Sequence, residues 1–172
     1  MTRLEGSWVI EPLRKDHDRA AFTCEENSLA QYIKTQASQD ARRFTAAPFV
    51  AVTDGGKTVL GYYTLSSTTL ELTAVPENIA KKLPRYPTLP ATLLGRLARD
   101  QSVAGKGLGE FLLMDSLHRA YVQSKEIASA AVLVDAISHK AATFYRHFDF
   151  LEFADNPNRL FLPMPKIAKL FA

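Results

Sequence analysis

The fold is decided by residues 92–122, which read TLLGRLARDQSVAGKGLGEFLLMDSLHRAYV. Residues 92–99 form an apolar run that predicts a strand. Residues 108–122 space their apolar side chains so that these cover one broad face of a helix. Between the two runs, residues 104–109 carry glycine at every second position. We therefore expect a strand, a glycine loop and a helix in direct succession.

Further strands and helices are predicted on both sides of this stretch. On the N-terminal side we expect strands at 8–13, 48–53 and 58–70, a glycine turn at 54–56, a helix from an N-cap at Asn27 to about Arg43, and a short helix at 76–83. On the C-terminal side we expect a strand at 130–136, a helix capped by Ser138, a strand at 159–163 and a helix at 166–171. This order predicts an α+β fold, in which helices flank a mostly antiparallel mixed sheet with one parallel crossover.

Composition limits the class of protein. The 172 residues are 47% apolar and 23% charged, which predicts one globular domain over residues 1–172. No run of apolar residues is long enough to span a membrane, and the N-terminus has no apolar leader segment. The single cysteine, Cys24, excludes an internal disulfide and a cysteine-built zinc site, so we expect a reducing cytoplasm and no metal. The net charge of +3 fits an anionic partner such as a nucleotide or RNA, and it equally fits an ordinary enzyme surface.

The glycine loop has the chemistry of an anion site. It consists of Ala104, Gly105, Lys106, Gly107, Leu108 and Gly109. Glycines let the backbone approach a bulky anion, and the helix that follows adds the partial positive charge of its N-terminus. The spacing matches neither a P-loop nor the dinucleotide-binding pattern. A pyrophosphate site and a plain tight turn both remain open from the spacing alone.

The loop in its strand–helix context resembles the coenzyme A loop of the GNAT superfamily of N-acetyltransferases. Gly107 and Gly109 match the two small positions of the pattern Gln/Arg-x-x-Gly-x-Gly/Ala, whereas Ala104 replaces its usual Gln or Arg. The resemblance implies the GNAT fold and acetyl-CoA as co-substrate. It also places the backbone of three strand residues beside the pantetheine arm: Leu97, Ala98 and Arg99. The N–H of Ala98 is a candidate oxyanion donor, and Lys106 either contacts the phosphates or points to solvent.

A second signature lies in residues 141–150, where a helix carries Phe-Tyr before an aromatic turn. Phe144 and Phe148 are four residues apart, so we expect both in the core. Tyr145 shares a stripe with Ala142, which leaves room for a ligand. The resemblance implies that Ala142 and Phe144 contact coenzyme A and that Tyr145 protonates its departing sulfur. The alternative is a tyrosine at the rim of the core, and His139 and His147 are expected to have no catalytic role.

The whole chain is similar to a narrower group, the GNAT toxins of bacterial type II toxin–antitoxin modules. The similarity includes residues 29–33, 39–43, 61–66, 84–87 and 134–136. It implies acetylation of the α-amino group of aminoacyl-tRNA, which blocks translation. An α-amine has a pKa of about 7.7–8.0 and needs less help from a base than a lysine amine. Glu71 and Asp135 are base candidates by position only.

A tRNA substrate requires cations near the site. The candidates are Arg42, Arg43, Lys81, Lys82, Arg85 and Arg96, each of which could also be an ordinary solvated or ion-paired side chain. The resemblance further implies a ribbon–helix–helix antitoxin, contact with DNA only through that antitoxin, and a homodimer. Two alternatives stay open. One is a GNAT enzyme for a small-molecule or protein amine, and the other is a non-catalytic module that binds coenzyme A or an antitoxin–DNA complex.

Overall fold

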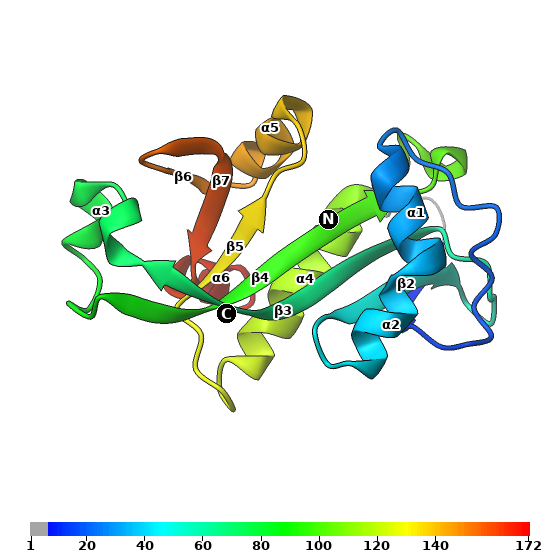
Figure 1. Ribbon diagram of the computed structural model, residues 1–172, viewed down its shortest axis with the longest axis horizontal. Coiled ribbons are helices and arrows are strands. Elements are labelled where there is room, and N and C mark those ends of the chain that lie inside the picture. The colour runs from blue at the N-terminus through cyan, green and yellow to red at the C-terminus, as the bar shows by residue number, and fades with distance from the viewer. Residues whose placement is uncertain (1–6) are drawn as a thin grey trace. The chain divides into compact units, whose positions relative to one another are not determined.

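The computed structural model describes residues 7–172, and Figure 1 shows the order of its elements. The strands are β1 (Trp8–Pro12), β2 (Ala47–Thr53), β3 (Gly61–Glu71), β4 (Thr88–Arg99), β5 (Ala131–Asp135), β6 (Leu151–Phe153) and β7 (Asn156–Pro163). The helices are α1 (Asn27–Thr35), α2 (Ala37–Arg42), α3 (Glu77–Ala80), α4 (Leu108–Gln123), α5 (His139–His147) and α6 (Met164–Leu170), with 3₁₀ turns η1 (Leu72–Ala74) and η2 (Gln101–Val103). None of the helices within residues 7–172 is both long and apolar enough to cross a membrane. Residues 1–6, part of the segment predicted to lack a leader, lie outside the described residues.

The strands form a seven-stranded sheet in the order β1-β2-β3-β4-β5-β7-β6. β4 and β5 are parallel and are joined through α4, with Leu93 opposite Leu133. The pairs β1–β2, β2–β3, β5–β7 and β6–β7 are antiparallel. The structure thus confirms the predicted mixed sheet with a parallel crossover.

The chain divides into two compact units, and the first comprises the described part of Met1–Ser66 together with Gly95–Ser116. Its core includes Phe22, Tyr32 and Tyr62, and the ring of Tyr62 contacts the rings of the other two. The buried Tyr62 hydroxyl donates to the Leu29 carbonyl at 2.6 Å. Cys24 packs against this core, where its thiol donates to the Glu26 carbonyl at 3.1 Å.

The second unit comprises Ser67–Leu94 and Leu117–Ala172. Its core includes the buried side chains Leu70, Leu133 and Phe161. Helix α5 packs on β7, and α6 follows β7 directly (Figure 1). The ring of Phe171, just beyond α6, contacts the rings of His118 and Tyr121 in the last part of α4.

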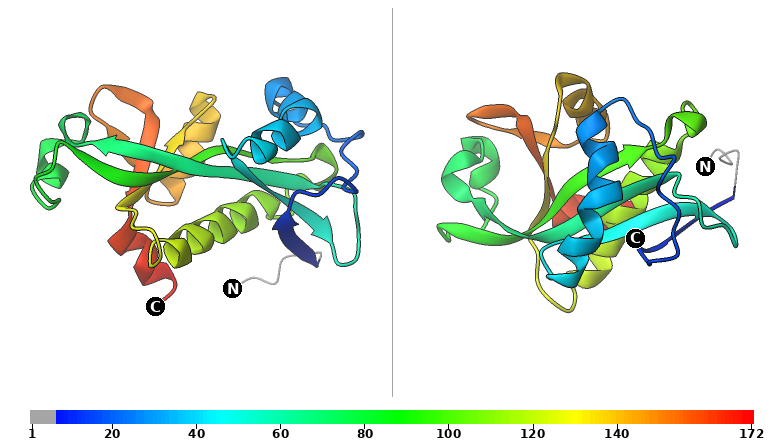
Figure 2. Two further views of the ribbon diagram at one scale, coloured as in Figure 1. Left: turned by 60° about the horizontal axis from the view of Figure 1, so that its bottom comes forward. Right: turned by 45° about the vertical axis from the view of Figure 1, so that its right-hand side comes forward.

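The predicted helix from Asn27 to Arg43 is in fact two helices, α1 and α2, which Figure 2 shows as separate segments. The break is at Gln36, and its physical cause is a side chain inserted into the helix ladder. The guanidinium of Arg19 donates to the Ile33 carbonyl at 3.2 Å and to the Ser38 hydroxyl at 2.8 Å. The predicted cap was also misplaced, because Asn27 lies inside α1 and Glu26 is the N-cap residue.

The sequence prediction also misjudged two strands. β4 begins at Thr88 instead of residue 92, and it includes Pro90. A proline fits there because its carbonyl still accepts from the Ala130 N–H at 2.7 Å, while Leu89 and Ala91 on either side are buried. The three-residue β6 was not predicted, because so short a segment has no readable alternation.

Candidate functional site

The glycine loop is fixed at its start by Asp100, which follows β4 and is almost completely buried. The Asp100 carboxylate accepts from the Thr23 N–H at 2.7 Å and from the Ser102 N–H at 2.9 Å. Its own N–H donates to the Leu60 carbonyl at 2.7 Å. Burial alone would raise the pKa of Asp100, but these hydrogen bonds lower it below its usual value. A charged carboxylate therefore holds the end of β4 in one position.

Two glycines of the loop adopt a conformation that other residues avoid. Gly105 has φ of +76° and Gly107 has φ of +84°, both in the left-handed region. A Cβ built on Gly105 would meet no atom within 4 Å. The backbone angle at position 105 thus favours glycine, and the space beside it is open.

Helix α4 begins directly after Gly107. Its first rung runs from the Phe111 N–H to the Gly107 carbonyl at 3.1 Å, so the N–H groups of Leu108, Gly109 and Glu110 precede the helical ladder. Unpaired N–H groups and the helix dipole together favour an anion at this point. The 16 residues of α4 make it the longest helix among residues 7–172.

The first turns of α4 lie very close to β3 and β4, and Gly61 makes this possible. A Cβ on Gly61 would lie 2.9 Å from Leu112 Cδ1, 3.0 Å from Leu108 Cδ2 and 3.2 Å from the Ala98 carbonyl oxygen. A side chain at position 61 would therefore force these leucines to shift. The strand that is expected to pair with the pantetheine arm and the helix that is expected to hold the pyrophosphate are therefore packed together within the first unit.

The loop residues fit a pyrophosphate-bearing ligand such as coenzyme A. The open space beside Gly105, the N–H groups at the start of α4 and the exposed Lys106 side chain all suit an anion. Leu97 and Arg99 are half-buried on β4, and Ala98 between them is buried. Within residues 7–172, no group of three or more His, Cys, Asp or Glu side chains could hold a metal ion.

Tyr145 lies on α5, in the second unit. Ser138 caps this helix as predicted, because its hydroxyl accepts from the Ala141 N–H at 3.1 Å. The Tyr145 side chain is 6% exposed, and its ring contacts the rings of Phe144 and Phe150. Within residues 7–172 its hydroxyl forms no hydrogen bond. Burial raises the pKa of Tyr145 well above its usual value, so the phenol keeps its proton throughout the neutral range.

The expected core face of α5 was wrong. Ala142 and Tyr145 are its buried side chains, whereas Phe144 and Phe148 are half-buried and contact each other edge to face. The cause lies in spacing, since Ala142 and Tyr145 are three residues apart and share a face just as Phe144 and Phe148 do. Ala142 and Tyr145, the pair with the smaller total volume, occupy the interior face.

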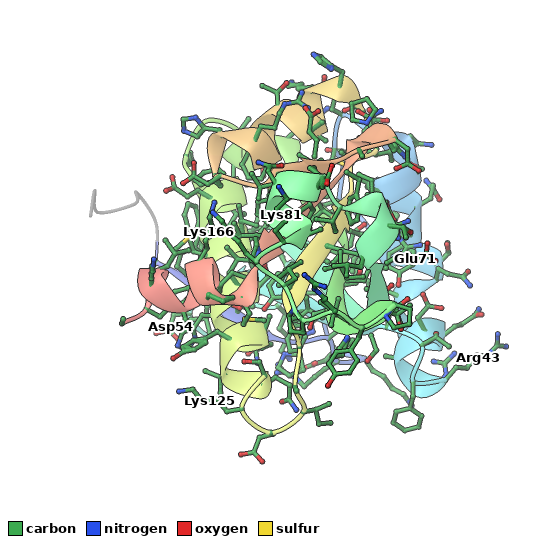
Figure 3. All side chains as sticks on the ribbon, turned by 90° about the vertical axis from the view of Figure 1, so that its left-hand side faces the viewer. Arg43, Asp54, Glu71, Lys81, Lys125 and Lys166 are labelled. Atoms are coloured by element: carbon green, nitrogen blue, oxygen red, sulfur yellow. The ribbon has the colours of Figure 1, made fainter. Side chains whose placement is uncertain are left out.

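The two candidate bases also lie in the second unit. Asp135 ends β5 and forms an ion pair with Arg159 of β7, with 3.3 Å between carboxylate and guanidinium. Glu71 ends β3 and is exposed to solvent, where Figure 3 labels it. Both carboxylates are exposed to solvent.

The predicted phosphate-binding cations fall into two sets. Arg42, Arg43 and Arg96 lie in the first unit, and Lys81, Lys82 and Arg85 lie in the second. All are exposed except Arg96, which is half-buried over the ring of Tyr32. Figure 3 shows Lys81 beside α3 and Arg43 beyond the end of α2.

Two features of the site were missed by the sequence reasoning. The role of Asp100 was not predicted, although an Asp directly after a strand often accepts a hydrogen bond from the N–H two residues later, as Asp100 does from Ser102. The contact of Arg96 with Tyr32 had no signal in the sequence, because the two residues are far apart along the chain.

Comparison with known proteins gives relatives along almost the full length. A probable toxin TacT of Sinorhizobium fredii is 30% identical over 94% of this chain and 94% of its own. A tRNA-acetylating toxin of Mycobacterium tuberculosis is 33% identical over 86% of each chain. A scan against models of protein families finds no match.

Solved structures show the same fold with functional partners bound. AtaT complexed with acetyl-methionyl-tRNAfMet superposes with a TM-score of 0.88 at 31% identity, covering 96% of this chain and 100% of that one. AtaTR bound with acetyl-CoA gives 0.84 at 30% identity, covering 96% and 99%. A KacTA–DNA complex gives 0.80 at 29% identity, covering 96% and 98%.

Proposed function

The chain belongs to the family of tRNA-acetylating GNAT toxins, and from that premise we propose that it is the toxin of a type II toxin–antitoxin module. It transfers an acetyl group from acetyl-CoA to the α-amino group of aminoacyl-tRNA and so blocks translation. The single observation that carries this proposal is the match to AtaT with acetyl-methionyl-tRNAfMet, which extends over the whole of that chain. Because aminoacyl-tRNA is used in the cytoplasm, we place the protein there.

The proposed cofactor site is the glycine loop. The N–H groups of Leu108, Gly109 and Glu110 stabilise the pyrophosphate of acetyl-CoA, and Gly105 and Gly107 give the backbone the required turn. Lys106 is exposed and adds positive charge. On β4, the backbone of Leu97, Ala98 and Arg99 pairs with the pantetheine arm, and the Ala98 N–H donates to the carbonyl oxygen of the acetyl group.

The proposed acid is Tyr145. When bound, acetyl-CoA supplies the acetyl group as a thioester, which a neutral amine can attack. The Tyr145 hydroxyl then gives its proton to the departing sulfur, since it has no acceptor within residues 7–172 and a pKa that keeps it protonated. Ala142 and Phe144 flank it on α5 and contact the cofactor. The α-amine loses its proton to ordered water, because Asp135 is paired with Arg159 and Glu71 is exposed to solvent.

The proposed partners follow the family. The substrate is aminoacyl-tRNA, whose phosphates contact Arg42, Arg43, Lys81, Lys82, Arg85 and Arg96. An antitoxin of the ribbon–helix–helix type covers the toxin, and the complex contacts DNA only through the antitoxin. The toxin itself is a homodimer. Support comes from a mutant AtaT toxin solved with the C-terminus of the antitoxin AtaR and from a KacTA–DNA complex.

The experiment is incubation of the purified protein with radiolabelled acetyl-CoA and separate pools of charged tRNA, uncharged tRNA and cell protein. We expect label only in the charged tRNA pool, and label in cell protein alone would favour the alternative substrate class. Tyr145→Phe is expected to bind coenzyme A with unchanged affinity and to lose about 10²–10⁴-fold in turnover. His147→Ala, an exposed change on the same helix, serves as control and should keep full activity.

A further inference from the structure

Phe44, just beyond α2, is an aromatic side chain in a position where glycine is the normal choice. The Thr45 N–H donates to the Asp40 carbonyl at 3.0 Å, and the Phe44 N–H donates to the Ala41 carbonyl at 3.2 Å. These two bonds form a Schellman cap, whose left-handed residue is usually glycine. Phe44 occupies that position with φ of +59°. A bulky residue is disfavoured there on conformational grounds.

The Phe44 side chain is not buried by the fold. It is 95% exposed, the highest value among the large apolar side chains within residues 7–172. Its ring contacts no other ring in the described part of the chain. The cap holds the ring away from the protein, because the residue at this position points outward from the helix end. A strained backbone that presents an apolar ring to solvent requires an explanation outside the folded monomer.

The immediate neighbours of Phe44 are cations. Arg42 and Arg43 are both exposed, and within residues 7–172 neither forms an ion pair. The carboxylate of nearby Asp40 already accepts from the Tyr32 hydroxyl at 2.6 Å. Figure 3 shows Arg43 reaching outward from the end of α2. The segment Arg42-Arg43-Phe44 therefore presents two unpaired positive charges next to one free aromatic face.

This combination is the chemistry of single-stranded nucleic-acid binding. Guanidinium groups bind phosphates, and an exposed ring stacks on a base that is not paired within a helix. An acidic protein surface would also suit two arginines beside an apolar ring, and the antitoxin measurement below tests that alternative. We infer that Phe44 stacks on an unpaired base of the tRNA substrate, with Arg42 and Arg43 on the adjoining phosphates. This inference rests on the proposed function and specifies one contact of it.

The test uses three substitutions at position 44 in the full-length protein. Phe44→Gly removes the ring and also relieves the backbone, so the midpoint of thermal unfolding should stay the same or rise. Binding of deacylated tRNA should weaken by about 5- to 150-fold, the range expected for loss of one stacked base. Phe44→Tyr should keep wild-type affinity. The affinity for coenzyme A should remain unchanged in both variants, because Phe44 lies outside the proposed cofactor loop.

A spectroscopic variant tests stacking directly. Phe44→Trp places an exposed indole at the cap, and its fluorescence should be quenched as tRNA is added. Trp8 is the only natural tryptophan, so the wild-type protein measures its background. Ile127→Ala is the matched control, since it removes another exposed apolar side chain, 73% exposed, and should leave tRNA affinity unchanged.

The outcomes separate this inference from the proposed function. If wild-type protein acetylates aminoacyl-tRNA while Phe44→Gly binds tRNA as tightly as wild type, the stacking contact is wrong and the function stands. If Phe44→Gly loses affinity for the antitoxin alone, the ring is a protein contact and the inference is overturned. If the wild-type protein neither binds nor acetylates aminoacyl-tRNA, the proposed function itself fails, and this inference fails with it.

Discussion

The guanidinium of Arg96 lies 3.7 Å from the centroid of the Tyr32 ring. The hydroxyl of the same tyrosine donates to the Asp40 carboxylate at 2.6 Å, and its ring stacks on Tyr62. Arg96 therefore has a packing role in the first unit that sequence reasoning did not foresee. Its contribution to stability can be separated from its proposed contact with tRNA.

Replacement of Arg96 should destabilise the fold. Arg96→Ala removes the cation–π contact and should lower the free energy of unfolding by about 1–2 kcal/mol. In a protein that already carries Tyr32→Leu, Arg96→Ala should lower the free energy of unfolding much less than it does in the wild-type protein, because the two residues form one contact. Chemical denaturation of both single variants and the double variant measures this coupling. Additive losses would mean that the contact contributes no stability.

The exposed arginines should differ from Arg96 in their dependence on salt. Arg42→Gln with Arg43→Gln should weaken tRNA binding and lower the slope of log affinity against log salt by about 2, one for each phosphate contact. The fold should be unaffected, since both side chains are exposed. Lys125→Gln is the control, because it removes an exposed cation that is not among the proposed RNA contacts. Lys125 lies over the ring of Tyr121, 4.6 Å from its centroid. An unchanged slope in the double variant would remove both arginines from the RNA contact.

Stability in acid should depend on Asp100. Its native pKa is lowered by hydrogen bonds from Ser102 and Thr23, so its contribution is complete above the unfolded-state pKa and disappears as the pH falls through the native value. Asp100→Asn should therefore cost about 2 kcal/mol at pH 7, and the cost should shrink progressively as the pH falls below the ordinary Asp pKa. Denaturant unfolding across this pH range checks this.

The exposed Asp16 provides the comparison for Asp100. It forms surface ion pairs with Arg14 and Lys57. Asp16→Asn should leave the midpoint of denaturant unfolding nearly unchanged, because exposed ion pairs contribute little to stability. A loss as large as that of Asp100→Asn would show that the buried hydrogen bonds contribute nothing special.

The two glycines near α4 should respond differently to alanine. Gly61→Ala forces a Cβ against Leu112, Leu108 and the Ala98 carbonyl, and it should cost about 1–3 kcal/mol through overpacking. Gly105→Ala meets no atom, so it should cost about 1–2 kcal/mol through its backbone angle alone. Gly105→Asn should restore most of that loss, since Asn tolerates the left-handed region. Calorimetry with coenzyme A should show weaker binding for Gly61→Ala.

The pH profile of turnover should have one limb. The α-amine of the substrate loses its proton with a pKa of about 7.7–8.0, so the rate should rise through that range. Burial raises the pKa of Tyr145, so no fall from loss of its proton is expected up to pH 10. Initial rates between pH 6 and 10 test this. A descending limb that Tyr145→Phe abolishes would place the pKa of this phenol at an ordinary value.

The sequence predicts the parts of this protein whose cause is local. The glycine loop and the helix after it follow from residues 104–122, and Ser138 caps α5 as its side-chain chemistry requires. The break between α1 and α2 could not be foreseen, because Arg19 reaches it from outside the helix. Pro90 misled the prediction of β4, since proline is excluded only where its missing N–H is needed.

The candidate site shows the same division. The roles of Tyr145 and the loop glycines stay predictions from the family resemblance. The interior face of α5 was assigned to Phe144 and Phe148, whereas the buried side chains are Ala142 and Tyr145. The spacing of apolar residues predicts two apolar faces on α5, but it does not show which of them packs against the rest of the protein. The exposure of the Phe44 ring could not be predicted from the sequence either, because it depends on the positive φ of that residue.

The thiol of Cys24 should be poorly reactive, which makes the protein suitable for labelling at an introduced cysteine. Burial raises its pKa, its hydrogen bond to the Glu26 carbonyl occupies its proton, and no second cysteine exists in the chain. The natural protein should therefore react slowly with maleimide dyes at neutral pH. A cysteine introduced at an exposed position such as Tyr86 would take the dye almost alone. Single-molecule fluorescence on this toxin can thus begin from the unmodified background.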